Sequence, residues 1–248
     1  MTLLQQTPLV VGTIRPEGLA ALFALPRVKR WPDIIEARLD LAVDSANPTI
    51  LPDLRPFLAT CGQLEASGST VLGTIRLVAD GGRWLDDVQR LPWFDQALAV
   101  ASWVDIELES AIAAEVVTRA HARGRQVIVS HHDFARTPDV ETLSAVVDRC
   151  RALGGDIVKI ATLVETLEDH ARLIDLLRGR VGEPLAVIGM GPIGTPLRSY
   201  LPSIGSRLAY GYLDQVAAPG QIHAGELVQR LVSDCPLYAE HRRSKARP

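Results

Sequence analysis

Residues 157–177 read IVKIATLVETLEDHARLIDLL, and the pattern changes partway along this stretch. The first six residues are mostly apolar or β-branched, which is typical of a buried strand. From Val164 onward apolar residues recur every three or four positions, which predicts an amphipathic helix. Glycine and proline punctuate both ends, at 154–155 and 182–184. The stretch therefore predicts one strand followed by one helix.

This strand-and-helix unit recurs along the whole chain. Eight runs are expected to be strands: 9–15, 34–40, 71–76, 103–109, 126–132, 157–162, 185–190 and 207–213. Helix-like stretches lie between most of them, as at 111–123, 140–153 and 164–177. Alternating strands and helices form parallel sheets, and eight such units in about 250 residues fit a closed barrel. We expect an α/β protein with a single-domain (β/α)8 TIM barrel over residues 1–240.

A doubly wound open sheet is the alternative architecture for such alternation. Its dinucleotide-binding form needs G-x-G-x-x-G directly after the first strand. Gly12 stands alone at that point, which favours the barrel. Residues 241–248 form a short basic tail that we expect to be disordered.

Composition excludes several classes of partner. The chain has 26 Lys and Arg against 29 Asp and Glu, so no positive field favours nucleic acid. We see no uncharged apolar run long enough for a bilayer and no export signal, and so expect no membrane partner. The three cysteines are far apart, which predicts neither a disulfide framework nor a metal site and fits a reducing cytoplasm.

Active sites of (β/α)8 barrels lie at the carboxyl ends of the strands, so polar residues there are candidates. Glu36, Arg38 and Asp40 share one face of the second strand, and a structural ion pair is as good an interpretation for them as a binding role. Asp105 and Glu107 lie within an apolar run, where unpaired acids would be costly. We expect these two to be scaffold that pairs with cations.

Lys159 is one of only three lysines and lies inside an apolar run, so we expect its amine to point into the barrel. Burial lowers a lysine pKa, and a neutral amine can form a Schiff base with a ketone. A buried ion pair with Asp105 or Glu107 is the alternative. His132 ends the preceding strand, and a histidine can move protons near neutral pH. The presence of His132 on the neighbouring strand favours a catalytic role for both Lys159 and His132. Alternation points His131 away, toward the helices.

Glycine-rich segments follow the last two strands, at 189–194 and 217–221, and are typical of mobile loops that cover ligands. The cations near them are Arg198 and Arg207. A single arginine suits bidentate recognition of a carboxylate as well as it suits phosphate.

These motifs together resemble type I 3-dehydroquinate dehydratase over most of the chain. The resemblance rests on the segments 36–40 (EARLD), 74–76 (TIR), 80–82 (DGG), 105–108 (DIEL), 130–134 (SHHDF), 137–138 (TP), 159–161 (KIA), 190–191 (MG), 198 (R), 205–206 (GS) and 218–222 (APGQI). It implies a barrel, usually a homodimer, that removes water from 3-dehydroquinate to give 3-dehydroshikimate in the shikimate pathway. It implies no metal and no organic cofactor.

The resemblance also implies a role for each site residue. Lys159 would form the imine, His132 would be the general acid and base, and Asp80 would orient His132. The substrate-binding residues would be Glu36, Arg38 and Arg76 for ring hydroxyls, Arg198 for the carboxylate, Gln221 as the closing residue, and Phe134 and Met190 as apolar walls.

Two positions depart from the family pattern. Asp80 stands where we expect glutamate, and we expect it to reach His132 only through an inward loop shift or a water. Ala217 stands where we expect serine, and a lost hydroxyl contact costs about 0.5–1.5 kcal/mol. Two other functions therefore stay open: a Schiff-base enzyme acting on a related cyclic keto acid, or a class I aldolase; and a noncatalytic metabolite-binding barrel.

Overall fold

The computed structural model of the protein describes residues 7–26, 32–218 and 220–245. All eight expected strands are present and parallel, in the order β7-β6-β5-β4-β3-β2-β1-β8. They are β1 (Leu9–Ile14), β2 (Ile34–Arg38), β3 (Thr70–Thr74), β4 (Trp103–Glu107), β5 (Gln126–Asp133), β6 (Ile157–Leu163), β7 (Leu185–Met190) and β8 (Leu208–Tyr212). The Arg207 amide donates to the Leu185 carbonyl at 2.8 Å, which joins the two ends of the sheet into a nearly closed barrel.

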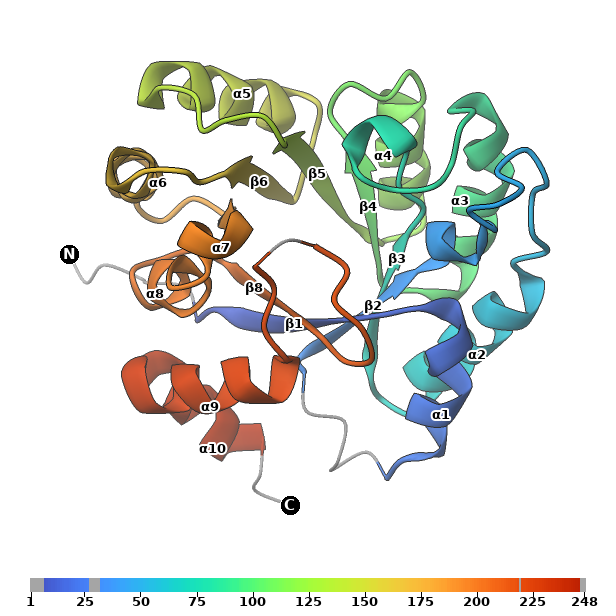
Figure 1. Ribbon diagram of the computed structural model, residues 1–248. Coiled ribbons are helices and arrows are strands. Elements are labelled where there is room, and N and C mark those ends of the chain that lie inside the picture. Colours follow the sequence, from blue (N-terminus) through green and yellow to red (C-terminus); the bar gives the residue numbers. More distant parts are fainter. Residues whose placement is uncertain (1–6, 27–31, 219, 246–248) are drawn as a thin grey trace.

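Helices surround the strands, as Figure 1 shows, and the expected (β/α)8 barrel is confirmed. The α-helices in the described part of the chain are α1 (Leu19–Ala24), α2 (Arg55–Ala66), α3 (Leu91–Val100), α4 (Ala113–Ala122), α5 (Val140–Ala152), α6 (Leu167–Gly179), α7 (Gly191–Gly194), α8 (Leu197–Ser203), α9 (Ala224–Asp234) and α10 (Pro236–Lys245). Helix α6 begins later than the apolar periodicity predicts because Thr166 and Asp169 form a capping box at its start. None of the described helices is both long and apolar enough to cross a bilayer.

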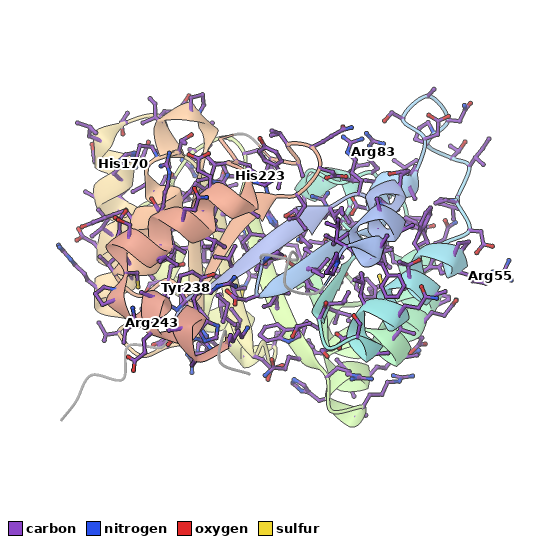
Figure 2. All side chains as sticks on the ribbon, turned by 90° about the horizontal axis from the view of Figure 1, so that it is seen from below. Arg55, Arg83, His170, His223, Tyr238 and Arg243 are labelled. Carbon is purple, nitrogen blue, oxygen red and sulfur yellow. The ribbon has the colours of Figure 1, made fainter. Side chains whose placement is uncertain are left out.

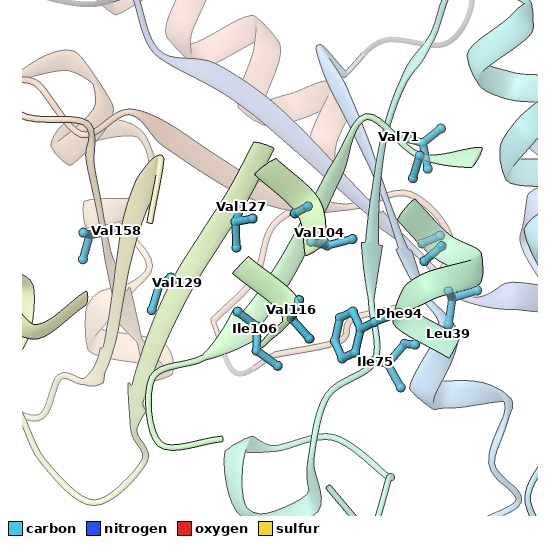
Figure 3. Packing of buried hydrophobic residues seen from close by; sticks show 14 of the residues in the cluster. Leu39, Val71, Ile75, Phe94, Val104, Ile106, Val116, Val127, Val129 and Val158 are labelled. Carbon is cyan, nitrogen blue, oxygen red and sulfur yellow. The ribbon is translucent and has the colours of Figure 1, made fainter. Parts of the chain in front are cut away.

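Two apolar layers hold the barrel together. The inward faces at the amino ends of the strands fill the barrel interior with residues such as Val11, Leu72 and Ile128. The outward faces pack against the helices, and Figure 3 shows Phe94 of α3 and Val116 of α4 within this outer layer. Because the interior is filled at one end, space for a ligand remains at the other end, where the strands finish.

The C-terminal segment differs from the expected disordered tail. Residues 241–245 belong to α10, and residues 246–248 lie outside the described part of the chain. Figure 2 shows α9 and α10 (red) beside β1 (blue) and labels Tyr238. The buried carboxylate of Asp33 accepts hydrogen bonds from Tyr238 Oη at 2.9 Å and Lys245 Nζ at 3.0 Å, and it lies 3.1 Å from His241 Nε2. These contacts fix a helix that local sequence alone does not predict.

The segment after β7 also differs from the expected loop. Residues 191–194 form the short helix α7, which continues closely into α8. Pro192 fits the first turn of α7 because its missing N–H has no helical partner to lose there. This helical segment places Arg198, on α8, at the barrel mouth.

Candidate active site

A cavity of about 300 Å³ opens at the carboxyl ends of the strands. It brings together all ten site residues that the sequence suggested: Lys159, His132, Asp80, Glu36, Arg38, Arg76, Arg198, Gln221, Phe134 and Met190. In Figure 1 the segment between β8 and α9 crosses the front of the barrel, and its residues Ala217 and Ala218 also line the cavity. His131 does not line it, in agreement with the expected alternation.

Strand register explains why these side chains meet. Ser130 of β5 pairs with Lys159 of β6, and His132 pairs with Ala161 in the same ladder. Residues two apart on a strand share a face, so His132 and Lys159 both face the barrel interior from adjacent strands. His132 lies one step closer to the mouth than Lys159.

The amine of Lys159 is buried between an acid and an aromatic ring. Its Nζ donates to Asp105 Oδ2 at 2.9 Å and lies 4.4 Å from the centre of the Tyr210 ring. Burial lowers the pKa of Lys159, and the Arg76 guanidinium lowers it further, while the Asp105 carboxylate opposes both effects. The expected alternatives for Lys159 are therefore both present, since it pairs with an acid and also lines the cavity.

Asp105 is the centre of a buried network beneath the cavity. Its Oδ2 is 2.9 Å from Arg76 Nη2, and its Oδ1 accepts from Ser130 Oγ at 2.6 Å. Although burial alone would raise the pKa of Asp105, the cations Arg76 and Lys159 hold that pKa far below its usual range. Asp105 and Glu107 do not line the cavity, as expected for scaffold acids.

His132 lies beside Asp80 and Phe134. The Nδ1 atom of His132 is 3.3 Å from Asp80 Oδ1, so the shorter carboxylate reaches the imidazole directly. The Phe134 ring is stacked on His132 with centroids 6.0 Å apart. Burial and the nearby charges of Arg76 and Lys159 hold the pKa of His132 well below 6.5. Burial and the charge of Glu107 raise the pKa of Asp80 to about 6.

The glycines after Asp80 allow this approach. The segment folds back so that the Gly82 amide donates to the Leu77 carbonyl at 2.8 Å. A Cβ on Gly82 would lie 2.1 Å from the carbonyl oxygen of Arg76, which leaves no space for a side chain. The Asp80-Gly81-Gly82 motif is therefore required by backbone geometry as well as by the position of the carboxylate.

Hydroxyl groups hold Glu36 in place on the opposite side of the cavity. Thr13 Oγ1 donates to Glu36 Oε2 at 2.8 Å and Thr74 Oγ1 donates to Glu36 Oε1 at 3.0 Å. Gln221 Nε2 donates to Thr13 Oγ1 at 3.3 Å, while Gln221 Oε1 accepts from the Ala217 amide at 2.9 Å. Gln221 thus ties the segment after β8 to β1.

The cationic residues at the mouth have different surroundings. Arg38 forms a two-pronged ion pair with Asp40, with distances of 2.9 and 2.8 Å, as one of the two sequence interpretations expects. Arg198 is buried beside the cavity, and burial lowers its pKa to about 10. A buried guanidinium facing a cavity is suited to an anionic group of a ligand.

Sequence reasoning missed two polar lining residues, Tyr210 and Thr13. Tyr210 lies within an apolar strand and reads as core, and Thr13 lies in the first strand, from which no candidate was taken. Strand alternation identifies both residues, because side chains two positions apart point to the same face. Thr13 is two residues beyond Val11, and Tyr210 is two residues beyond Leu208, and both of these earlier residues lie in the barrel interior.

The fold and the cavity define a class of protein, a (β/α)8-barrel enzyme with a buried lysine and a histidine lining a cavity at the carboxyl ends of its strands. A family model described as type I 3-dehydroquinase matches residues 10–234, and the chain belongs to this family.

Individual relatives agree with the family match. The chain is 33% identical over 202 residues to 3-dehydroquinate dehydratase of Thermococcus gammatolerans, covering 81% of this chain and 87% of that protein. It is 29% identical over 227 residues to the enzyme of the same name from Methanococcoides burtonii, covering 90% and 93%. The crystal structure of 3-dehydroquinate dehydratase from Aquifex aeolicus superposes with a TM-score of 0.77 and 27% identity, covering 91% of this chain and 98% of that one.

Proposed function

We propose that the protein is a lyase that dehydrates 3-dehydroquinate to 3-dehydroshikimate through a Schiff base on Lys159. The observation that carries this proposal is the meeting of a buried lysine and a partly buried histidine in one cavity of a chain from the type I 3-dehydroquinase family. The activity supplies one dehydration step of the shikimate pathway.

Imine formation is the first stage. The neutral amine of Lys159 attacks the ketone carbon, and the carbonyl oxygen becomes the hydroxyl of a carbinolamine. His132 moves protons between nitrogen and oxygen, so that this hydroxyl leaves as water and a protonated imine remains. The lowered pKa of Lys159 favours the attack because more of the amine is uncharged near neutral pH.

Elimination is the second stage. His132, whose low pKa keeps the imidazole neutral and therefore able to accept a proton, takes a proton from the carbon beside the imine, and the bonding electrons move into the C=N group. These electrons then return to form a C=C bond as the hydroxyl on the next carbon leaves with a proton as water. Hydrolysis of the imine consumes the water released in the first stage, so one water is lost per substrate.

The remaining lining residues are proposed to bind the substrate. Arg198 is suited to the carboxylate because it is a buried guanidinium at the cavity. Glu36, Arg38 and Arg76 supply acceptors and donors for ring hydroxyls. Phe134 and Met190 are apolar walls, and Gln221 closes the site through the segment that it holds.

We also propose that the enzyme is cytoplasmic and homodimeric. All three cysteines are free and buried, which suits a reducing compartment. The homodimer rests on the family resemblance, and light scattering of the purified protein tests it through the measured mass.

A related cyclic keto acid is the second candidate substrate, because Ala217 brings a methyl group instead of a hydroxyl to the cavity wall. A panel of ring keto acids separates the two candidates. We expect kcat/KM to be highest for 3-dehydroquinate, measured by absorbance of the conjugated product. A much higher value for another compound would transfer the proposal to that substrate, and binding without turnover of any compound would support the noncatalytic alternative.

A further inference from the structure

An ion pair outside the cavity connects to the active site. Arg90 and Glu107 are both buried, and Arg90 Nη1 donates to Glu107 Oε2 at 2.7 Å. The same guanidinium also donates to the Ile75 carbonyl at 2.6 Å and to Ser110 Oγ at 3.1 Å. Its other ion-pair partner is Asp87, at 2.5 Å. Arg90 therefore joins the ends of β3 and β4 to the short helical turn that precedes α3.

The other oxygen of Glu107 holds the segment that carries Asp80. Glu107 Oε1 accepts from the Leu77 amide at 3.0 Å and lies 3.5 Å from Arg76 Nη1. Leu77 in turn closes the turn that contains Asp80, since its carbonyl accepts from the Asp80 amide at 3.0 Å. The position of Asp80 beside His132 thus depends on a backbone amide that Glu107 fixes.

The charge of Glu107 also acts on the carboxyl group of Asp80. Besides His132, Asp80 faces the acids Glu107 and Asp105 of β4 and the cations Arg76 and Arg90. After burial, Glu107 has the largest effect on the pKa of Asp80 and raises it, while the two arginines lower it. Removal of the Glu107 charge should therefore make Asp80 more acidic.

We propose that Arg90 and Glu107 are positioning residues for the proton-transfer pair His132 and Asp80. Glu107 holds the turn that carries Asp80 and supplies a negative charge close to it, and Arg90 fixes Glu107 in place. Neither residue lines the cavity, so their role is exerted through other residues. The kinetic part of this inference rests on the proposed function, but the titration of Asp80 does not.

Glu107→Gln tests the charge. The amide oxygen can still accept from the Leu77 amide, and Arg90 keeps Asp87, Ser110 and the Ile75 carbonyl. In the free enzyme labelled with ¹⁵N-histidine, the His132 signals report the titration of its neighbour Asp80. We expect its midpoint, near 6 in the unaltered protein, to fall by about one pH unit in the variant.

Asp33→Asn is the matched control, because Asp33 is also a buried, paired acid but belongs to the amino-terminal end of the barrel. This control should lose stability without moving the midpoint. A folded Glu107→Gln protein with an unchanged midpoint would overturn the inference, as would an equal shift in the control.

Glu107→Asp tests the position and still gives an answer if the glutamine variant does not fold. It keeps the charge but shortens the reach to Leu77 and Arg90. We expect the midpoint to stay near 6 while kcat for 3-dehydroquinate falls about tenfold. An unchanged kcat in this variant would contradict the positioning role. Absence of turnover in the unaltered protein would refute the proposed function alone, because the titration needs no substrate.

Discussion

Lys159 and Arg76 share one carboxylate oxygen: Asp105 Oδ2 is 2.9 Å from the nitrogen of each side chain. A carboxylate divided between two cations does not neutralise either completely. Burial lowers the pKa of Lys159 most and the Arg76 charge lowers it further, so Lys159 belongs to a buried ion pair and still has a lowered pKa. The network holds the amine in place while leaving it able to lose a proton.

Breaking this network should be costly for stability. Asp105→Asn leaves the buried cations Arg76 and Lys159 side by side without their shared anion. We expect the free energy of unfolding in urea to fall by about 3–5 kcal/mol, the usual cost of removing one partner from a buried pair. Asp44→Asn, at an exposed acid that accepts hydrogen bonds from Ala46 and Asn47 of its own turn, is the control and should lower stability far less. Equal stability of both variants would show that the network does not balance charge.

Asp80 should destabilise the fold above about pH 6. The pKa of Asp80 is raised from 3.8 to about 6. Between these two pH values the folded state keeps a proton on Asp80 that the unfolded state has lost. The contribution of Asp80 to stability is therefore present below 3.8 and is lost as the pH rises through about 6. Asp80→Asn should unfold at a higher temperature above pH 6, with the gain disappearing in acid, and should lose turnover. A gain that is independent of pH would argue against the raised pKa.

The two adjacent histidines provide an internal comparison. His132→Gln should reduce kcat by about 10²–10⁴-fold, the usual contribution of a general acid and base. His131→Gln should leave kcat close to that of the unaltered enzyme, since His131 lies outside the cavity. Steady-state assays at one pH are sufficient for both. Similar losses in the two variants would refute the assignment of proton transfer to His132.

We expect the ring and the hydroxyl group of Tyr210 to have opposite effects on the stability of the fold. Its buried Oη has no hydrogen-bond partner among the described residues, while its ring faces Lys159 Nζ. Tyr210→Phe keeps the ring and removes a buried hydroxyl whose desolvation costs about 1–3 kcal/mol. The melting temperature of the free protein should rise by a few degrees, and calorimetry measures it. A lower melting temperature would mean that the hydroxyl is stabilising after all.

The fold was predictable because its signals are local. Each strand is a nearly continuous apolar run because both of its faces are buried, and the eight runs agree with the strands to within about two residues. The segment 241–245 was wrongly expected to be disordered because the stabilising partner of α10, Asp33, lies more than 200 residues away in the sequence.

The lining of the candidate site was predictable where chemistry marks a residue and less so where only geometry does. Lys159 is notable in sequence because a charge inside an apolar run needs a reason. Arg90 gives no such signal, since one arginine in a polar segment looks like any surface cation, and only the fold reveals that it is buried. Tyr210 is hidden for the opposite reason, because an aromatic residue in a strand reads as core.

Borohydride trapping tests the covalent role of Lys159 most directly. The protein is reduced in the presence of 3-dehydroquinate, digested, and examined by mass spectrometry, with Lys159→Met as the control that removes the amine and keeps an apolar side chain of similar length. If Lys159 forms the imine, the peptide containing it gains the mass of the reduced ligand, turnover is lost irreversibly, and the control stays unmodified. An unmodified Lys159 in an enzyme that turns over 3-dehydroquinate, or an adduct on another residue, would contradict it.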